Sequence, residues 1–103
     1  MRVLEFNVEG TLLTKERKCN FRDIERGSNK YLRLQFNLDS EWIGKAKVAE
    51  VRNVSGVTKL FTVINNVCDL TDDVTNESLF SVRLYGKNGE TKLKTNKVYV
   101  NQK

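Results

Sequence analysis

The sequence predicts one all-β domain over residues 1–103, an antiparallel β-sandwich of about seven to eight strands. Apolar and polar residues alternate through Tyr31–Leu38, which puts four side chains on one face: Leu32, Leu34, Phe36 and Leu38. A second alternating run, Phe80–Tyr85, carries Phe80, Val82 and Leu84 on one face and leads to Asn88-Gly89, a dipeptide typical of two-residue hairpin turns. Two such apolar faces leave water by covering each other, so these residues are the predicted core. At 103 residues, one such core is enough for stability without crosslinks.

The first third of the chain predicts one long strand followed by a polar segment. Val3–Leu13 is the strand, and Gly10 within it indicates a bulge or a bend. Lys15–Lys18 is a charged turn, and the alternation of Cys19–Phe21 allows a short second strand. Arg22–Asn29 is rich in turn-forming residues and is expected to be a loop.

The middle of the chain predicts two further strands and one helical turn. Lys45–Arg52 alternates, although its two faces are not cleanly separated, and Thr58–Ile64 is rich in β-branched and aromatic residues. Thr71 is a candidate N-cap for a short helical turn, and Asp72 and Asp73 would complement the positive end of that turn.

The closing hairpin has a predicted register and a predicted irregularity. A turn centred on Asn88-Gly89 sets these pairs: Leu84 with Leu93, Tyr85 with Lys92, and Arg83 with Lys94. Val98 and Val100 then have the opposite parity from Leu93, so one residue near Thr95-Asn96 is extra. A β-bulge at that point reconciles the two halves of the strand.

The residue types argue against catalysis and metal binding. The chain has no histidine, and Cys19 and Cys68 are single cysteines far apart, which are too few ligands for a zinc site. We expect both to be free thiols that serve as small core residues. Because adjacent carboxylates such as Asp72 and Asp73 do not converge in a strand, we expect a non-enzymatic protein without catalytic residues, cofactor or metal.

The charge distribution and three tyrosines indicate a binding surface. The formal net charge is +5, with 8 Lys/Arg against 5 Asp/Glu in residues 1–35, 4 against 7 in residues 36–80, and 6 against 1 in residues 81–103. Each tyrosine lies on the polar face of its predicted strand, together with basic residues. The candidate partner-binding residues are therefore Tyr31, Arg33, Arg83, Tyr85, Lys92, Lys94, Lys97 and Tyr99. Such side chains can anchor a protein interface or stack bases of a single-stranded nucleic acid, and tyrosine also suits strands for its own reasons.

An ordered set of short motifs resembles small β-sandwich domains of structural proteins from tailed bacteriophages and prophages, chiefly of Gram-positive hosts. The motifs, from Tyr31 onward, are Phe36, Glu41-Trp42, Lys47-Val48-Ala49, Val51, Asn66-Val67-Cys68-Asp69-Leu70, Phe80-Ser81-Val82, Tyr85-Gly86 and Thr95–Val100. The chain departs from that pattern at Thr71-Asp72, where proline is common, and at Val51, where an aromatic residue is common. The region before Tyr31 carries no part of the resemblance.

The resemblance implies an Ig-like sandwich acting as a virion component, such as a baseplate or tail module, a head fibre or a capsid decoration protein. Its partners would be other phage structural proteins or further copies of the same chain, and it transfers no catalytic or ligand residue. The alternatives are a small oligonucleotide-binding barrel and a phage-encoded inhibitor of a host protein. The chain shows neither a signal peptide nor a membrane-spanning run, so we expect synthesis in the host cytoplasm, no membrane contact and later incorporation into the virion.

Overall fold

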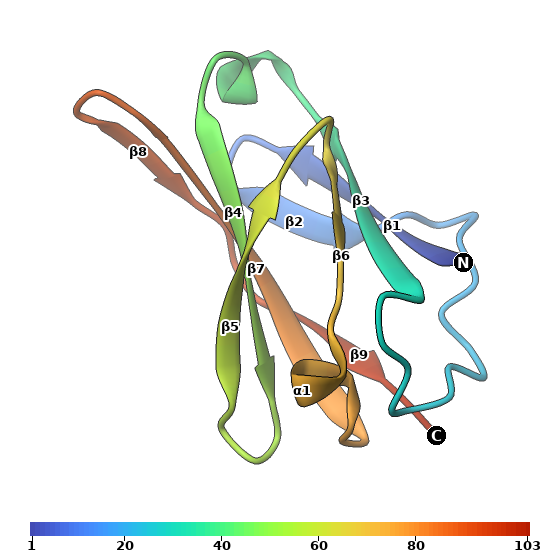
Figure 1. Cartoon of the computed structure of the whole chain (residues 1–103). Helices are drawn as coiled ribbons and strands as arrows, with labels where there is room; N and C mark the ends of the chain where they lie inside the picture. Colours follow the sequence, from blue (N-terminus) through green and yellow to red (C-terminus); the bar gives the residue numbers. More distant parts are fainter.

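Nine strands in two sheets make up most of the structure, a computed structural model that describes residues 1–103 (Figure 1). One sheet, here the first sheet, has the order β2-β1-β3-β6, from β1 (Arg2–Glu9), β2 (Leu12–Lys15), β3 (Leu32–Leu38) and β6 (Val67–Asp69). The second sheet has the order β5-β4-β7-β8, with β9 also paired to β7, from β4 (Ala46–Asn53), β5 (Thr58–Val63), β7 (Leu79–Asn88), β8 (Thr91–Lys94) and β9 (Val98–Asn101). The predicted all-β class is therefore confirmed, but nine strands replace the expected seven to eight.

Two strands go beyond the expected ones: β2 arises where an expected single strand divides, and β6 forms in a segment for which no strand was predicted. The expected strand Val3–Leu13 breaks at Gly10, where φ is +58°, and folds back as a hairpin that pairs Glu9 with Leu12. A second tight turn follows β5, where Asn65 and Asn66 both have positive φ and Ile64 bridges to Val67. This turn carries the chain from the second sheet into the first, and β6 forms as a short strand there.

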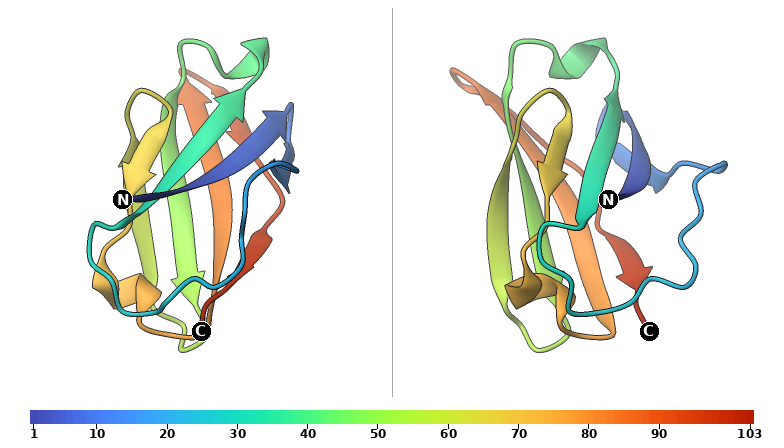
Figure 2. Two further views of the ribbon diagram at one scale, coloured as in Figure 1. Left: turned by 90° about the vertical axis from the view of Figure 1, so that its right-hand side faces the viewer. Right: turned by 45° about the vertical axis from the view of Figure 1, so that its right-hand side comes forward.

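One strand pair is parallel, which corrects the expectation of a purely antiparallel fold. β1 and β3 pair in parallel along their whole length, with Leu4 beside Leu34 and Phe6 beside Phe36. The chain reaches this arrangement because residues 16–31 run back to the start of β1 before β3 begins (Figure 2). Parallel pairing places apolar residues of equal parity in the same rows, and the Phe6 and Phe36 rings stack with centroids 5.7 Å apart.

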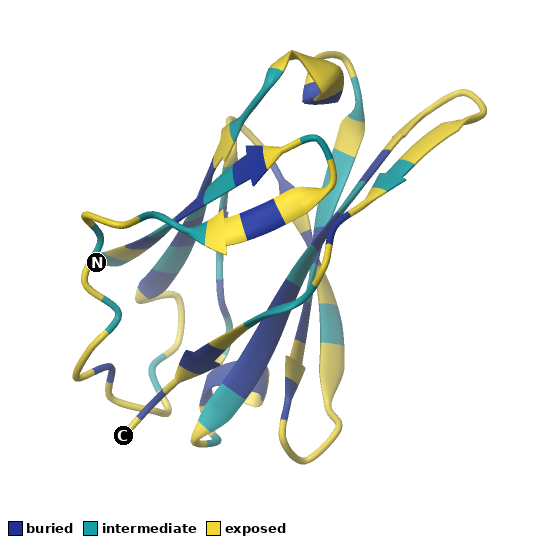
Figure 3. Ribbon diagram, turned by 180° about the vertical axis from the view of Figure 1, so that it is seen from behind, coloured by how far each residue is buried: buried dark blue, intermediate teal, exposed yellow.

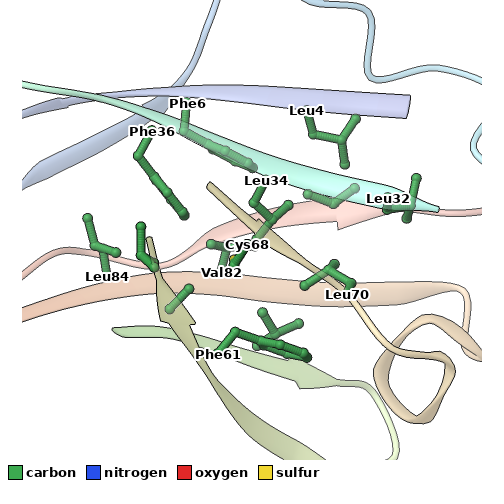
Figure 4. Packing of buried hydrophobic residues seen from close by; sticks show 14 of the residues in the cluster. Leu4, Phe6, Leu32, Leu34, Phe36, Phe61, Cys68, Leu70, Val82 and Leu84 are labelled. Carbon is green, nitrogen blue, oxygen red and sulfur yellow. The ribbon is translucent and has the colours of Figure 1, made fainter. Parts of the chain in front are cut away.

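The core draws twenty buried hydrophobic residues from both sheets and the connecting segments (Figure 4). Six of the seven predicted core residues are among them: Leu32, Leu34, Phe36, Phe80, Val82 and Leu84. Leu38 is only half-buried because it ends β3, where the chain turns into the 3-10 turn η1 (Ser40–Trp42). Trp42 is fully buried, and its indole Nε1–H donates to the Gly10 carbonyl at 2.8 Å.

The two cysteines are free thiols, as predicted, but only one lies in the core. Cys68 is 7% exposed and pairs with Leu34 across β3 and β6. Cys19 is half-buried and lies outside the core cluster, where its Sγ accepts from the Glu5 amide at 3.3 Å. The Glu16 amide, three residues before Cys19, donates to the Glu5 carbonyl. This segment therefore lies beside the first half of β1, which β2 does not pair with, and it does not start a strand.

The long segment of residues 16–31 contains no strand and is anchored at one end of the sandwich. Ile24 is 1% exposed and belongs to the core. The Gly27 amide donates to the Thr75 carbonyl, and the Lys103 amide donates to the Ile24 carbonyl, each at 2.7 Å. The segment therefore lies beside the short helix α1 (Asp72–Thr75) and the C-terminal residues, and together they cover that end of the core (Figure 2).

The helical turn is present where the sequence predicts it, although its cap differs in detail. Thr71 precedes α1, and Asp72 and Asp73 form the first turn. The Thr71 hydroxyl makes no hydrogen bond to a backbone amide of the helix and instead donates to the Asp73 carboxylate. The Lys59 ammonium lies 3.2 Å from Asp73, so this acidic pair is partly neutralised by β5.

The closing hairpin has a different register from the predicted one. The turn is centred on Gly89-Glu90, because Asn88 stays in β7 and pairs with Thr91. Only Gly89 has a positive φ, +58°, a conformation typical of type II′ hairpin turns. The register sets Leu93 opposite Gly86, where Leu93 packs against the core.

The predicted bulge near Thr95-Asn96 is confirmed. β8 pairs Lys94 with Tyr85, and β9 pairs Val98 with Val82. Two residues of β7 therefore face three residues of the other strand, which leaves one extra residue. At the bulge the Thr95 side chain takes the place of a backbone acceptor, since its hydroxyl oxygen accepts a hydrogen bond from the Leu84 amide at 3.0 Å.

Candidate functional site

The outer face of the second sheet brings together most of the predicted partner-binding residues. We use the term outer face for the side of this sheet turned away from the core, and alternation along β7 places Arg83 and Tyr85 there because Val82 and Leu84 are buried. The residues gathered at this face are Arg83 and Tyr85 from β7, Lys92 and Lys94 from β8, Lys97 from the bulge and Tyr99 from β9. The β7–β8 hairpin that carries two of these lysines projects beyond the rest of the sandwich and is largely exposed (Figure 3).

Two of the predicted residues lie elsewhere and are not part of this face. Tyr31 precedes β3 in the first sheet and is 49% exposed. Arg33 lies in β3 opposite Asp69 of β6, and its guanidinium donates to both carboxylate oxygens, at 2.7 and 3.2 Å. This pairing holds the pKa of Asp69 below its usual value, so Arg33 is occupied in linking two strands.

The observed register corrects the expected neighbours of the basic residues. Arg83 does not face Lys94; it lies opposite Glu50 of β4. Lys94 instead faces Tyr85, and the like-charged pair across the hairpin is Lys87 with Lys92. The one-residue shift of the turn moves every cross-strand pair of the hairpin, because register and turn position are coupled.

The outer face carries a surplus of positive charge that the protein does not neutralise. Six cationic side chains belong to it, Arg52, Arg83, Lys87, Lys92, Lys94 and Lys97, and none forms an ion pair. The carboxylate among them on the same strands is Glu50, which accepts from the Tyr85 hydroxyl at 3.4 Å. The Arg83 Nε is buried and has no hydrogen-bond partner, which leaves a donor unsatisfied.

A groove and a smaller pocket lie at opposite ends of this face. The groove has a volume of about 560 Å³ and is lined by Ala46, Val48, Tyr85, Gly86, Lys87, Lys92, Leu93 and Lys94. The pocket has a volume of about 190 Å³ and is lined by Arg52, Asn53, Val54, Leu79, Phe80, Ser81, Lys97 and Tyr99. The strand register explains which residues line each of them. Val48, Tyr85 and Lys94 lie side by side on neighbouring strands at the groove. Arg52, Ser81 and Tyr99 do so at the pocket.

Several residues of this face were not predicted from the sequence. Ala46 and Val48 lie beside Glu50 on the polar parity of β4, and Leu60 of β5 is 62% exposed next to them. The available signal was the poor separation of the two faces of Lys45–Arg52, since apolar residues on both parities of a strand indicate a second contact surface. Ser81 gave no signal, because its importance depends on the strands on either side of it.

Two further observations concern metal-ligating groups and the buried cysteine. No three His, Cys, Asp or Glu side chains come together in a group able to hold a metal ion. Burial raises the pKa of the Cys68 thiol to about 12, with a smaller contribution from Asp69, so this thiol is protonated at neutral pH. The helices of the structure are all too short to cross a membrane.

Comparisons of the chain with family models, with curated proteins and with solved structures each found no match.

Proposed function

We propose that this protein is a non-enzymatic binding module that contacts a partner protein through the outer face of the second sheet. The observation that carries the proposal is the combination of six unpaired cations with an apolar groove beside Tyr85. Tyrosine and arginine dominate the energy of protein interfaces, and apolar area surrounded by charge is typical of such contacts. An acidic partner would neutralise the surplus charge, and burial of the groove would supply affinity.

We further propose a setting for this module, an Ig-like accessory domain of a tailed-bacteriophage virion. The support is the ordered set of motifs from Phe36 to Val100, together with the two-sheet architecture that such domains share. The partner would then be another protein of the baseplate, tail, head fibre or capsid surface, or a second copy of this chain. The protein would fold in the host cytoplasm before assembly.

Charge reversal on the outer face tests the proposal. The variant Arg83→Glu/Lys94→Glu should remain folded, because both side chains lie outside the core, with a lower melting temperature because the new carboxylate at position 83 faces Glu50. It should lose incorporation into purified particles, measured by mass spectrometry, or lose self-association, measured by sedimentation. The matched control is Arg17→Glu/Lys18→Glu, which makes the same charge change at two exposed residues outside this face.

Three outcomes separate the alternatives. Equal incorporation of the charge-reversed and control variants would show that the outer face is the wrong surface. Absence of the wild-type protein from particles would rule out the virion setting. Stable co-purification with one host protein, lost in the charge-reversed variant, would instead support an inhibitor that uses the same face.

A single-stranded nucleic acid is the second candidate ligand, because Tyr85 and Tyr99 stand among basic residues on one face. Aromatic side chains in a basic groove stack successive bases with little sequence preference. Binding of labelled oligothymidylate should then be measurable and should weaken steeply as salt is raised. No binding at low salt would exclude this candidate.

A further inference from the structure

We infer that the outer face recognises an extended segment of the partner that carries an apolar side chain and a carboxylate about four residues apart. The inference rests on the proposed function and specifies the chemistry of the partner. The groove and the pocket lie at the two ends of the face, and β7 contributes Tyr85 to the first and Ser81 to the second. The two sites differ in character, so they select different side chains.

The groove suits an apolar side chain. Ala46 and Val48 line it with aliphatic carbon, and the ring of the half-buried Tyr85 adds an aromatic surface. Lysines from β7 and β8 stand at its edge and carry long methylene stems, which cover apolar surface while their ammonium groups stay in water. An apolar anchor in the groove with acidic residues beside it therefore matches both the lining and the rim.

The pocket suits a carboxylate. Ser81 is 7% exposed and lies between Arg52 of β4 and Tyr99 of β9 in one cross-strand row. Lys97 contributes a second cation to the lining, and neither Lys97 nor Arg52 has an acidic partner. Two cations with hydroxyl groups between them offer charge-assisted hydrogen bonds to a carboxylate.

The geometry of β7 sets the spacing between the two subsites. Ser81 and Tyr85 are four residues apart in one strand, which corresponds to about 13 Å in extended chain. A partner segment running along β7 in extended form therefore needs the same number of residues to reach both subsites. Arg83 lies midway between Ser81 and Tyr85 on β7, so its positive charge stands between the two subsites.

The position of Glu50 favours a peptide over a nucleic acid. Glu50 lies opposite Arg83, between the groove and the pocket. A nucleic-acid strand carries a phosphate at every nucleotide, so a strand crossing the face would bring one of them near this carboxylate, which costs energy. A peptide places its charges at chosen positions and leaves neutral backbone beside Glu50.

A displayed library of random peptides, selected on the immobilised protein, tests this inference. The wild type should enrich peptides that pair an aliphatic or aromatic residue with Asp or Glu at the stated spacing. Selection on the pocket variant Arg52→Glu/Lys97→Glu should retain the apolar preference and lose the acidic one. Selection on either groove variant, Tyr85→Ala or Val48→Thr, should do the opposite, and the thermal melt confirms that each is folded.

The outcomes that overturn the inference are distinct from those that overturn the proposed function. Enriched peptides without a fixed spacing, or the same enrichment on the pocket variant as on the wild type, would reject the two-site segment. The Arg17→Glu/Lys18→Glu control leaves the outer face intact and should enrich the same peptides as the wild type. The proposed function would still stand if Arg83→Glu/Lys94→Glu lost incorporation into particles or self-association in the experiment described above. If that variant behaved like the wild type in those assays and oligothymidylate bound the wild type, the two-site segment and the proposed protein-binding function would both be wrong.

Discussion

Gly86 is the residue at which the structure tolerates no side chain. A Cβ added there would lie 2.6 Å from Cζ3 and 2.8 Å from Cε3 of Trp42. The indole is fully buried and fixed by its hydrogen bond to Gly10, so it has no free space to enter. We predict that Gly86→Ala lowers the free energy of unfolding by about 1–3 kcal/mol, measured by chemical denaturation.

A double-mutant cycle separates this clash from the intrinsic effect of replacing glycine in a strand. Trp42→Phe removes part of the ring that the new Cβ would meet, at the cost of the bond to Gly10. The two substitutions together should then cost less than the sum of their separate effects. Strict additivity would indicate that Gly86 and Trp42 do not interact in the way the structure describes.

The Arg33–Asp69 ion pair predicts a pH-dependent contribution to stability. The hydrogen bond from Arg33 is the largest cause of the lowered pKa of Asp69, whose usual value is 3.8. Because the folded protein favours the ionised carboxylate, this stabilisation is complete above that value and is lost as the pH falls through the lower folded pKa. Asp69→Asn should therefore melt below the wild type at neutral pH, with the difference closing in acid.

The control for this pair is Asp72→Asn, which removes the same charge from a carboxylate that has no ion pair. The loss of melting temperature at neutral pH should be larger for the Asp69 variant than for this control. The effect is expected to be small, since both side chains of the pair are about a third exposed, at 38% and 33%. A constant difference between wild type and Asp69→Asn down to strongly acidic pH would contradict the assignment.

The bulge between β8 and β9 connects the two sheets through one side chain. Asn96 lies in the bulge. Its side-chain amide makes the two hydrogen bonds to the Leu13 backbone of β2 that a neighbouring strand would otherwise make. The Leu13 amide donates to Asn96 Oδ1 at 2.8 Å, and Asn96 Nδ2 donates to the Leu13 carbonyl at 3.0 Å. The bulge therefore has a structural role, because an unbulged strand would not place this side chain at β2.

We predict that Asn96→Ala destabilises the protein by about 1–3 kcal/mol, because the two Leu13 backbone groups lose their partners. The Leu13 amide should also lose protection in hydrogen exchange, while amides in the middle of β7 retain theirs. Asn96→Asp is the matched variant, since it keeps the acceptor for the Leu13 amide and replaces the donor to the Leu13 carbonyl by a charged oxygen. An unchanged exchange rate at Leu13 in the alanine variant would show that the contact is not formed.

The shared core predicts that both sheets unfold together. Phe36 from the first sheet and Val82 from the second belong to the same buried cluster, and no separate second cluster exists. Thermal unfolding should therefore give coincident transitions by far-ultraviolet circular dichroism and by Trp42 fluorescence. Phe36→Ala should cost about 3–5 kcal/mol and shift both transitions equally. Separate transitions would indicate two independent units.

The strand positions and their buried faces were largely predictable from the sequence. β3 and β7 begin within two residues of the predicted runs, and the side chains of Phe36 and Val82 point into the core as their parity requires. This success has a local cause, because alternation with a period of two depends only on the residues of one strand. The bulge near Thr95-Asn96 was predictable for the same reason, since a change of parity within one run requires an extra residue.

The candidate site was predicted only in part. Lys92, Lys94 and Tyr85 were correctly assigned to the outward parity of their strands, but Tyr31 and Arg33 proved to belong to a different sheet. Parity tells which face of its own strand a residue occupies. It does not tell which sheet contains that strand, so residues of equal parity need not share a surface.

The sequence by itself determined the all-β class, the approximate strands and six of the twenty core residues. Only the tertiary structure decided the parallel pairing of β1 with β3, the turn at Gly89-Glu90 and the convergence of groove and pocket on one face. The physical reason is that backbone hydrogen bonds between strands are the same for every residue type except proline. The choice among pairings therefore depends on which arrangement buries the apolar faces of all strands at once, as when the parallel pairing of β1 with β3 sets Phe6 beside Phe36 in the core.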